Sequence, residues 1–369
     1  MKNLIELTEE FAKRIVEIEN KRKKIGELLR EINSNTKLLL DQEVLEEKII
    51  VSVSKAKLLE IKVAGVDGGL VKRSFHGIDL MLLRAIGVLF NYKDDKLEKV
   101  EYYPEAIPTP TAKITFDPFS TLEFELNSNM ERQIIEIKTA RETIEKLNPA
   151  MIFLHGSIVP HYTEKPGKDS FLFPTYQRMI DSYKRLFEVA KEKGTIVAGI
   201  IEDSRGTRFC EIVNKNILSR AKAEITADIK PLLERTKDSN LLSYALELNE
   251  RSFVFRYSSK PEDHPVLKEF GNELAYLIFS FYLKTAEFDR PIRIDFLGNK
   301  GIFKVANQLS SVLLALAGHS GYGIPSVLIE ADQRAKLSKK DLELFYHDLI
   351  NRTGNLASTF SLRREQRPF

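Results

Sequence analysis

The first thirty residues carry apolar side chains at the spacing of a helix. Between residues 3 and 32, apolar positions such as Leu4, Leu7 and Phe11 recur every three or four residues, and most positions between them are Glu, Lys or Arg. Residues at this spacing lie on one face of a helix. The pattern therefore predicts one long amphipathic helix, which either covers its own core or offers a surface to a partner.

Short β-rich runs alternate with helical stretches between residues 60 and 200. The expected strands are Val63–Val66, Leu80–Phe90, Met151–Leu154 and Thr195–Ile201, and the expected helices are Met130–Leu147 and Tyr176–Lys193. Asp67–Gly68–Gly69, which lies between the first two strands, predicts a hairpin turn. Strand, helix, strand alternation favours parallel strands joined by crossover helices. The order indicates an α/β fold.

The remaining segments follow from the same periodicities. Tyr102–Pro118 holds four prolines and no helical period, so we expect an extended loop there. Further strands are expected at Ser252–Tyr257 and Ile292–Phe296, and further helices at Glu273–Thr285, Ile302–Leu316 and Lys339–Ile350. No linker rich in Pro, Gly or Ser interrupts the chain. We therefore expect a helical N-terminal region, residues 1–50, and one main domain, residues 51–369.

Length and composition describe a globular protein with a substantial core. The chain has 369 residues, of which 43% are hydrophobic. It lacks a run of about 18 apolar residues, and its charged N-terminal segment differs from a secretory signal. The single cysteine, Cys210, fits a reducing compartment and a small buried residue. We expect a cytoplasmic protein without a membrane anchor.

Net charge does not point to a particular partner. The 56 basic and 53 acidic residues leave a formal charge of +3, so any contact with nucleic acid must come from local clusters. Lys72–Arg73 is one such cluster, although adjacent basic residues also occur on ordinary solvated surfaces. The balance therefore leaves the partner to be identified from motifs.

Possible metal ligands follow the predicted strands. Asp67 comes directly after Val63–Val66, and His155 comes directly after Met151–Leu154. Mg²⁺ and Mn²⁺ bound at a phosphodiester need several hard ligands brought together from separate elements. Either residue alone has a plain structural explanation, since Asp-Gly favours a turn and a histidine often satisfies core hydrogen bonds. Together they indicate a metal site.

Two more acids complete the candidate set. Glu136 lies in the predicted Met130–Leu147 helix, with Glu131 as a weaker alternative, and Asp332 follows the Gly/Pro-controlled stretch that begins at Gly321. Asp332 also fits a supporting role for the next helix. The sequence contains no phosphate-binding loop, dinucleotide fingerprint, zinc protease motif or serine hydrolase elbow, so those classes have no motif behind them.

In this order the motifs resemble those of the NurA nuclease family. The segments that carry the resemblance are Val63–Gly69 with Leu83–Val88, the helix with Glu136, Phe153–Ile158, Arg293–Asp295 and Pro325–Ala335. Two positions depart from the family pattern. His155 stands where the family normally has Asp, and Glu202 stands where Lys is common.

The resemblance implies an RNase H-like mixed sheet flanked by helices, with a long N-terminal helix. It further implies an Mn²⁺- or Mg²⁺-dependent deoxyribonuclease with Asp67, Glu136, His155 and Asp332 as catalytic metal ligands. Arg205, Tyr322, Lys72 and Arg73 are the expected DNA contacts. The family also implies a homodimer that works with a HerA-type hexameric ATPase in resection of double-strand breaks, as a 5′–3′ exonuclease and single-strand endonuclease.

His155 leaves a second function open. An imidazole ligates Mn²⁺ but removes a negative charge from the site, so a catalytically impaired DNA clamp or adaptor for the same ATPase is the main alternative. A generic RNase H-like RNA-processing enzyme is a third hypothesis, which the C-terminal motif favours less.

Overall fold

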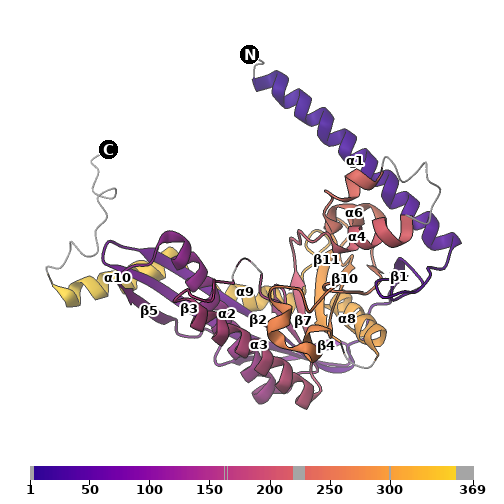
Figure 1. Cartoon of the computed structure of the whole chain (residues 1–369). Helices are drawn as coiled ribbons and strands as arrows, with labels where there is room; N and C mark the ends of the chain where they lie inside the picture. Colours follow the sequence, from indigo (N-terminus) through magenta and orange to yellow (C-terminus); the bar gives the residue numbers. More distant parts are fainter. Residues whose placement is uncertain (1–3, 162, 164, 219–228, 299–300, 355–369) are drawn as a thin grey trace. The chain divides into compact units, whose positions relative to one another are not determined.

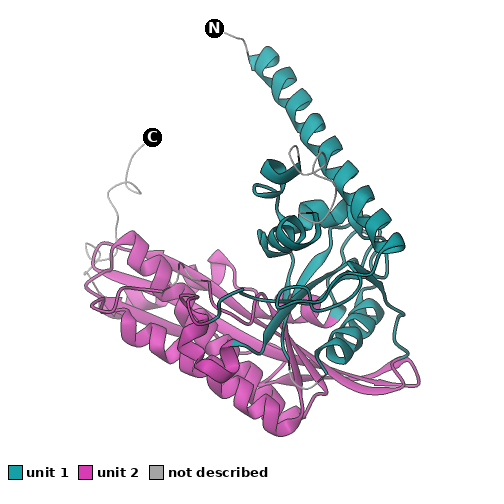
Figure 2. Ribbon diagram, turned by 45° about the vertical axis from the view of Figure 1, so that its right-hand side comes forward, with its two compact units in different colours: residues 1–57, 200–261, 276–326 teal, residues 58–199, 262–275, 327–369 magenta. Residues whose placement is uncertain are grey.

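The chain folds into two compact units. The computed structural model describes residues 4–161, 163, 165–218, 229–298 and 301–354 (Figure 1). Unit 1 comprises residues 1–57, 200–261 and 276–326, and unit 2 comprises residues 58–199, 262–275 and 327–369 (Figure 2). Each unit is therefore assembled from three separate stretches of the sequence.

Unit 2 is built on a mixed sheet with the strand order β7-β6-β2-β3-β4, in which β5 also pairs with β3. The strands are β2 (Glu60–Ser74), β3 (Ile78–Lys93), β4 (Lys96–Tyr103), β5 (Thr111–Phe116), β6 (Met151–His155) and β7 (Ile196–Ile201). β2 and β3 form a long antiparallel hairpin, whereas β2 and β6 are parallel. The parallel pair places the ends of β6 and of the apolar part of β2 next to each other.

Helices pack on both faces of the unit 2 sheet (Figure 1). They are α2 (Thr121–Leu147), α3 (Phe173–Lys193), α9 (Ser326–Ala335) and α10 (Lys339–Thr353), with the shorter turns η4 (Leu267–Phe270) and α7 (Asn272–Ala275). α2 begins at a capping box formed by Ser120 and Glu123, and its left-handed C-cap is Asn148. α2 packs on β2 and β3, and α3 packs on α2. α9 lies against the opposite face of β2.

Unit 1 contains a smaller antiparallel sheet with the order β1-β8-β10-β11, in which β9 also pairs with β10. The strands of this sheet are β1 (Ile50–Ser52), β8 (Glu250–Ser252), β9 (Phe255–Arg256), β10 (Ile278–Leu283) and β11 (Ile292–Leu297). The helices of unit 1 are α1 (Leu4–Asn35), α4 (Arg208–Ile212), the π-helical turn η2 (Val213–Ile217), α6 (Asp238–Ala245) and α8 (Ile302–Leu316). Ile25 and Leu29 of α1 join its core together with the buried Cys210.

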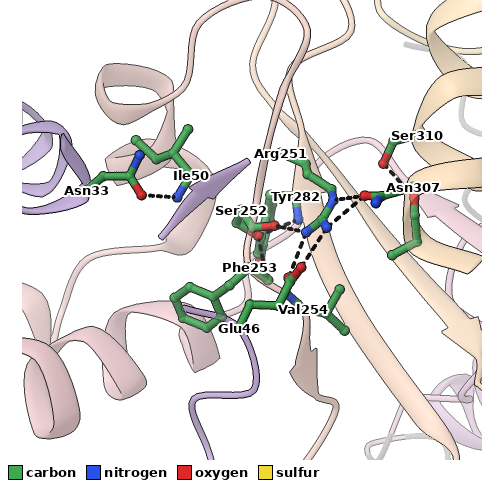
Figure 3. A network of polar contacts seen from close by, with 11 residues as sticks. Asn33, Glu46, Ile50, Arg251, Ser252, Phe253, Val254, Tyr282, Asn307 and Ser310 are labelled. Carbon is green, nitrogen blue, oxygen red and sulfur yellow. Dashed lines mark hydrogen bonds and ion pairs between the residues drawn. The ribbon is translucent and has the colours of Figure 1, made fainter. Parts of the chain in front are cut away.

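A buried arginine ties separate segments of unit 1 together (Figure 3). Arg251 of β8 is 1% exposed and donates to both carboxylate oxygens of Glu46, at 2.8 and 2.7 Å, and to the side-chain oxygen of Asn307 in α8. Glu46 also accepts from the backbone N–H of Val254. Burying a guanidinium is tolerable only when its donors are paired in this way, so the three segments depend on one another.

Two sequence predictions in the sheets are wrong. Asp67–Gly69 is not a turn, because β2 continues through these residues and pairs with β3 as far as Ser74. Glu273–Thr285 is not a helix. After one helical turn, α7, the chain enters β10, whose six residues are all buried. A fully buried strand lacks the polar alternation that identifies strands in a sequence.

Other boundaries differ in detail. The Tyr102–Pro118 segment contains β5 in addition to a loop, and the Ser252–Tyr257 segment is divided between β8 and β9. α9 lies in the stretch after Gly321, where the sequence predicted no helix. The long helices α1, α3, α8 and α10 agree with the predictions, and α2 agrees at its end but begins nine residues before the predicted Met130.

The predicted fold class is confirmed. The protein is mixed α/β, with a mixed sheet flanked by helices and a long N-terminal helix. Within the described ranges, no helix is both long enough and apolar enough to cross a membrane.

Candidate metal centre

Asp67 and His155 lie side by side on adjacent parallel strands. Val66 of β2 is paired with Leu154 of β6, so the next residue on each strand is a neighbour of the other. The Nδ1 atom of His155 lies 3.2 Å from the Oδ2 atom of Asp67. Asp67 is buried, and its Oδ1 atom accepts the backbone N–H of Gly68 at 2.7 Å. The strand register therefore creates a carboxylate and imidazole pair.

Asp332 of α9 completes a group of three. One ligand atom from each of Asp67, His155 and Asp332 lies within 4.8 Å of the other two. Asp332 is exposed, whereas Asp67 is buried, so the group opens to solvent on the side of the helix. Three ligand atoms at this separation can converge on a single cation with small side-chain adjustments.

Two glycines in β2 set the position of α9. A Cβ atom added at Gly65 would lie 2.7 Å from the carbonyl oxygen of Val327, and one added at Gly69 would lie 2.0 Å from that of Ala335. The helix backbone therefore rests directly on the strand at both ends. Asp332 lies between these two contact points, which explains how it comes close to Asp67.

Glu136 approaches from the other face of the strand. Successive residues of a strand face opposite sides, so Gly68 faces α2 while Gly65 and Gly69 face α9. A Cβ atom at Gly68 would lie 3.0 Å from the Oε2 atom of Glu136. The carboxylate thus lies against the backbone next to Asp67, but it is not one of the three clustered ligands. It also accepts a hydrogen bond from Arg132 at 2.6 Å.

Glu131, the alternative helical ligand, forms ion pairs with two basic side chains. Its carboxylate forms ion pairs with Lys113 of β5 and, at 2.9 Å, with Arg178 of α3. These contacts account for its burial. Glu136 is therefore the helical acid that lies beside Asp67.

The electrostatics of the acids fit a site for a cation. Burial, followed by the nearby charge of Asp67, raises the pKa of Glu136 to about 8 although Arg132 opposes the shift. Burial and the charge of Asp67 also raise the pKa of Asp332. A divalent cation stabilises the ionised forms that this environment disfavours. Carboxylate oxygens with one imidazole nitrogen form a donor set suited to Mn²⁺.

The four predicted DNA contacts are divided between the two units. Lys72 donates to Glu125 at 2.6 Å and to Ser128, and Arg73 lies over the Phe75 and Tyr346 rings. Both residues are thus occupied by contacts within unit 2. Arg205 and Tyr322 belong to unit 1, where the Tyr322 hydroxyl donates to Glu202 at 2.8 Å and Arg205 is exposed.

Sequence reasoning missed two residues that shape the site. Gly68 was assigned to a turn, and Arg132 was not singled out. The signal for Arg132 was present, because it precedes Glu136 by four residues and side chains at this spacing meet on a helix. The requirement for glycine at residue 68 depends on the distance between strand and helix, which a sequence pattern does not contain.

Several solved structures share this fold. A NurA nuclease from Sulfolobus solfataricus is 14% identical with a TM-score of 0.56, and the match covers 94% of this chain and 98% of that one. A NurA bound to dAMP and manganese is 12% identical with a TM-score of 0.56, covering 96% and 99%. A NurA with manganese is 13% identical with a TM-score of 0.51, covering 94% and 99%. At these identities the likeness shows the fold alone.

The family model gives a more direct assignment. Comparison with curated proteins found no match. The model described as the NurA domain matches residues 61–337, which is well over half of the chain and includes Asp67, Glu136, His155 and Asp332. The chain therefore belongs to the NurA family.

Proposed function

We propose that this protein is a divalent-metal-dependent deoxyribonuclease. The observation that carries the proposal is the group formed by Asp67, His155 and Asp332, whose ligand atoms lie within 4.8 Å of one another in a NurA chain. Solved relatives support it, since one is described as a nuclease and another holds manganese and dAMP.

The four candidate ligands have distinct roles. Asp67 and Asp332 supply carboxylate oxygens, His155 supplies an imidazole nitrogen, and Glu136 supplies a further carboxylate from the opposite face of β2. When bound, the metal polarises the phosphodiester and lowers the pKa of water. The side chains hold it where β2 passes the end of β6, on the side that the exposed Asp332 opens to solvent.

The donor set favours Mn²⁺ over Mg²⁺. Mg²⁺ prefers oxygen ligands in a near-octahedral arrangement, whereas Mn²⁺ accepts imidazole more readily. The neutral side chain of His155 also leaves the site with less negative charge than a carboxylate would. We expect the protein to use Mn²⁺ more efficiently, with Mg²⁺ as a weaker substitute.

Family membership supports the wider role as a proposal. We propose 5′–3′ exonuclease and single-strand endonuclease activity in double-strand-break resection, by a cytoplasmic homodimer that works with a HerA-type hexameric ATPase. Residues 51–369 form the nuclease domain, and residues 1–50 provide the dimer or ATPase contact. Arg205, Tyr322, Lys72 and Arg73 remain the proposed DNA contacts, and the last two must first release their partners within unit 2.

His155 favours a second candidate, an impaired DNA clamp or adaptor subunit. Its imidazole supplies one nitrogen where a carboxylate would supply charge and a second oxygen. If the remaining acids hold the metal too weakly, the protein binds DNA and the ATPase without cutting. The two candidates differ in whether purified wild-type protein cleaves DNA.

The test is cleavage of end-labelled linear duplex and single-stranded DNA by wild type and Asp67→Ala, with Mn²⁺, Mg²⁺ or EDTA. We expect the wild type to cut with Mn²⁺ and to lose activity in EDTA. Asp67→Ala should lose at least about a hundredfold in activity while unfolding at a similar temperature, because a metal ligand contributes more to stabilising charge in the transition state than to packing. Full activity in a folded Asp67→Ala protein would refute the proposed site. An inert wild type would favour the adaptor.

A further inference from the structure

We infer that Gly68 and Arg132 are positioning residues that set the Glu136 carboxylate for metal binding. This inference rests on the proposed function and adds two residues to its site. Neither residue is a proposed ligand. Their role follows from the route by which Glu136 reaches the strand.

Glu136 must approach the backbone of β2 closely, because Asp67 and His155 lie on the far face of the strand. Its Oε2 and Cβ atoms lie 3.0 and 3.1 Å from the place where a Cβ atom of residue 68 would be. Such separations are shorter than ordinary carbon contacts. Any side chain at residue 68 would therefore push α2 or the Glu136 side chain away from the strand.

Arg132 fixes the direction of the carboxylate. It lies one helical turn before Glu136 on α2, and its Nη1 atom donates to Glu136 Oε2 at 2.6 Å. Its Cγ atom lies 3.4 Å from the same empty position at Gly68, so the strand also confines the Arg132 stem. The Arg132 side chain is 29% exposed and that of Glu136 is 6% exposed. The guanidinium thus holds a largely buried carboxylate from its solvent side.

The two residues constrain different degrees of freedom. Gly68 sets how near Glu136 comes to the strand, and Arg132 selects the orientation that the carboxylate adopts there. A charge effect alone would make Arg132 a competitor that weakens binding of a cation. A positioning role predicts the opposite sign, because a ligand that is already oriented loses less conformational freedom on binding.

The experiment measures Mn²⁺ binding by isothermal titration calorimetry at one fixed pH, with thermal unfolding in EDTA as the check on folding. The variants are Arg132→Gln, Arg132→Lys and Gly68→Ala. Arg141→Gln is the matched control for charge, since Arg141 lies on the same helix, is 25% exposed and pairs with Glu142 and Glu145. Gly167→Ala is the matched control for glycine, because a Cβ atom there meets nothing within 4 Å.

We expect Arg132→Gln and Gly68→Ala to weaken Mn²⁺ binding by about 10- to 100-fold, the usual cost of losing a group that orients a metal ligand. Arg132→Lys should recover part of the loss, and both controls should bind as the wild type does. If Gly68→Ala does not fold, the two Arg132 variants decide the result.

Unchanged or tighter Mn²⁺ binding by folded Arg132→Gln overturns the inference, and tighter binding identifies Arg132 as a competitor of the metal. Failure of the proposed function appears differently. In that case the wild type itself takes up no Mn²⁺, or Asp67→Ala takes up as much as the wild type, and the inference falls with it.

Discussion

At the scale of single residues, the register of two parallel strands determines the chemistry of the site. Asp67 and His155 are adjacent because β2 and β6 pair Val66 with Leu154. A shift of one residue in either strand would turn one of the two side chains to the other face. The pair therefore depends on the core residues that set this register, and these are fully buried.

A substitution of His155 should change the preference of the site between Mg²⁺ and Mn²⁺. His155→Asp replaces a neutral nitrogen ligand by a charged oxygen ligand, so we expect tighter divalent cation binding and a larger gain in activity with Mg²⁺ than with Mn²⁺. The measurement is the ratio of cleavage rates in the two metals for wild type and variant, with His155→Ala as the control that removes the ligand. Equal rates for all three proteins would make His155 a residue without a metal role.

His264 is a source of pH dependence that does not involve the proposed metal ligands. Its Nδ1 atom accepts the backbone N–H groups of Val266 and Leu267, and burial lowers its pKa, so the folded protein favours the neutral ring. The neutral ring therefore stabilises the folded protein fully above the pKa of His264 in the unfolded chain, which is about 6.5. This stabilisation is lost as the pH falls through the lower pKa of the folded protein. Between about pH 7.5 and about pH 5, we expect the unfolding temperature of the wild type to fall further than that of His264→Asn. If the unfolding temperatures of the two proteins changed equally with pH, the prediction would be wrong.

The sequence identifies residue types better than it identifies their partners. Asp67 and His155 were recognisable because each directly follows an apolar run, and these two runs pair in parallel in the sheet. Asp332 depended on a helix, α9, that the sequence pattern did not reveal. Glu136 was placed on the correct helix, but its approach from the opposite face follows from the packing distance between α2 and Gly68.

At the scale of elements, β2 lacks side chains at two positions where α9 packs on it, and this lets the helix backbone come close to the strand. A strand interior normally gains from branched side chains, and glycine there weakens the sheet. β2 nevertheless has glycine at residues 65 and 69, where the α9 backbone lies within van der Waals distance. The contact holds the Asp332 carboxylate near β6. The two glycines therefore weaken the strand but allow the site to form.

Gly69→Ala tests this contact. Its Cβ atom would lie 2.0 Å from the Ala335 carbonyl oxygen, so α9 must move away from the strand. We expect a loss of about 1–3 kcal/mol in the free energy of unfolding, as for other overpacked sites, measured by urea denaturation. Because Asp332 moves with the helix, Mn²⁺ binding should weaken as well, whereas Gly167→Ala should change neither quantity. A variant with unchanged stability and metal binding would mean that α9 does not set the position of Asp332.

Helices with one exposed face were predictable, whereas the buried strand β10 was not. α3 has buried residues at helical spacing and a Gly194 cap, and both features are visible in the sequence. β10 reads Ile-Phe-Ser-Phe-Tyr-Leu with every residue buried, so neither period applies and the short helix before it misleads. The Asp67–Gly69 turn failed because pairing with β3 outweighed the local turn preference.

At the scale of the whole molecule, the two halves of α1 have different environments. The C-terminal half contributes Ile25 and Leu29 to the unit 1 core, and Gly26 lies against Tyr244 of α6. The N-terminal half exposes Leu4, Phe11 and Ile15 by 80%, 58% and 60%. Large apolar side chains in a row on an exposed helix are typical of a surface that binds another protein. This half is the part of residues 1–50 that we propose for the dimer or ATPase contact.

Phe11→Glu tests that proposal without touching the core. We expect it to lower the dimer mass measured by light scattering, or to weaken co-elution with a HerA-type ATPase, because it places a charge within the apolar stripe. The matched control is Asn20→Glu, which adds the same charge on the opposite side of the helix, nine residues further on. Unchanged dimer mass and unchanged ATPase binding in Phe11→Glu would refute a contact through this surface.

The Arg251 network has a consequence for how the protein is made. Glu46 and Arg251 are 205 positions apart, so a ribosome adds the guanidinium long after the carboxylate. Meanwhile residues 58–199, which carry the unit 2 strands from β2 to β6 and most of β7, have all been synthesised. Domains tend to fold as their residues emerge, and a lone charge stays in water until its partner arrives. We therefore expect the part of unit 2 formed by residues 58–199 to order first during translation, while the nascent α1 leaves its apolar stripe open to chaperones.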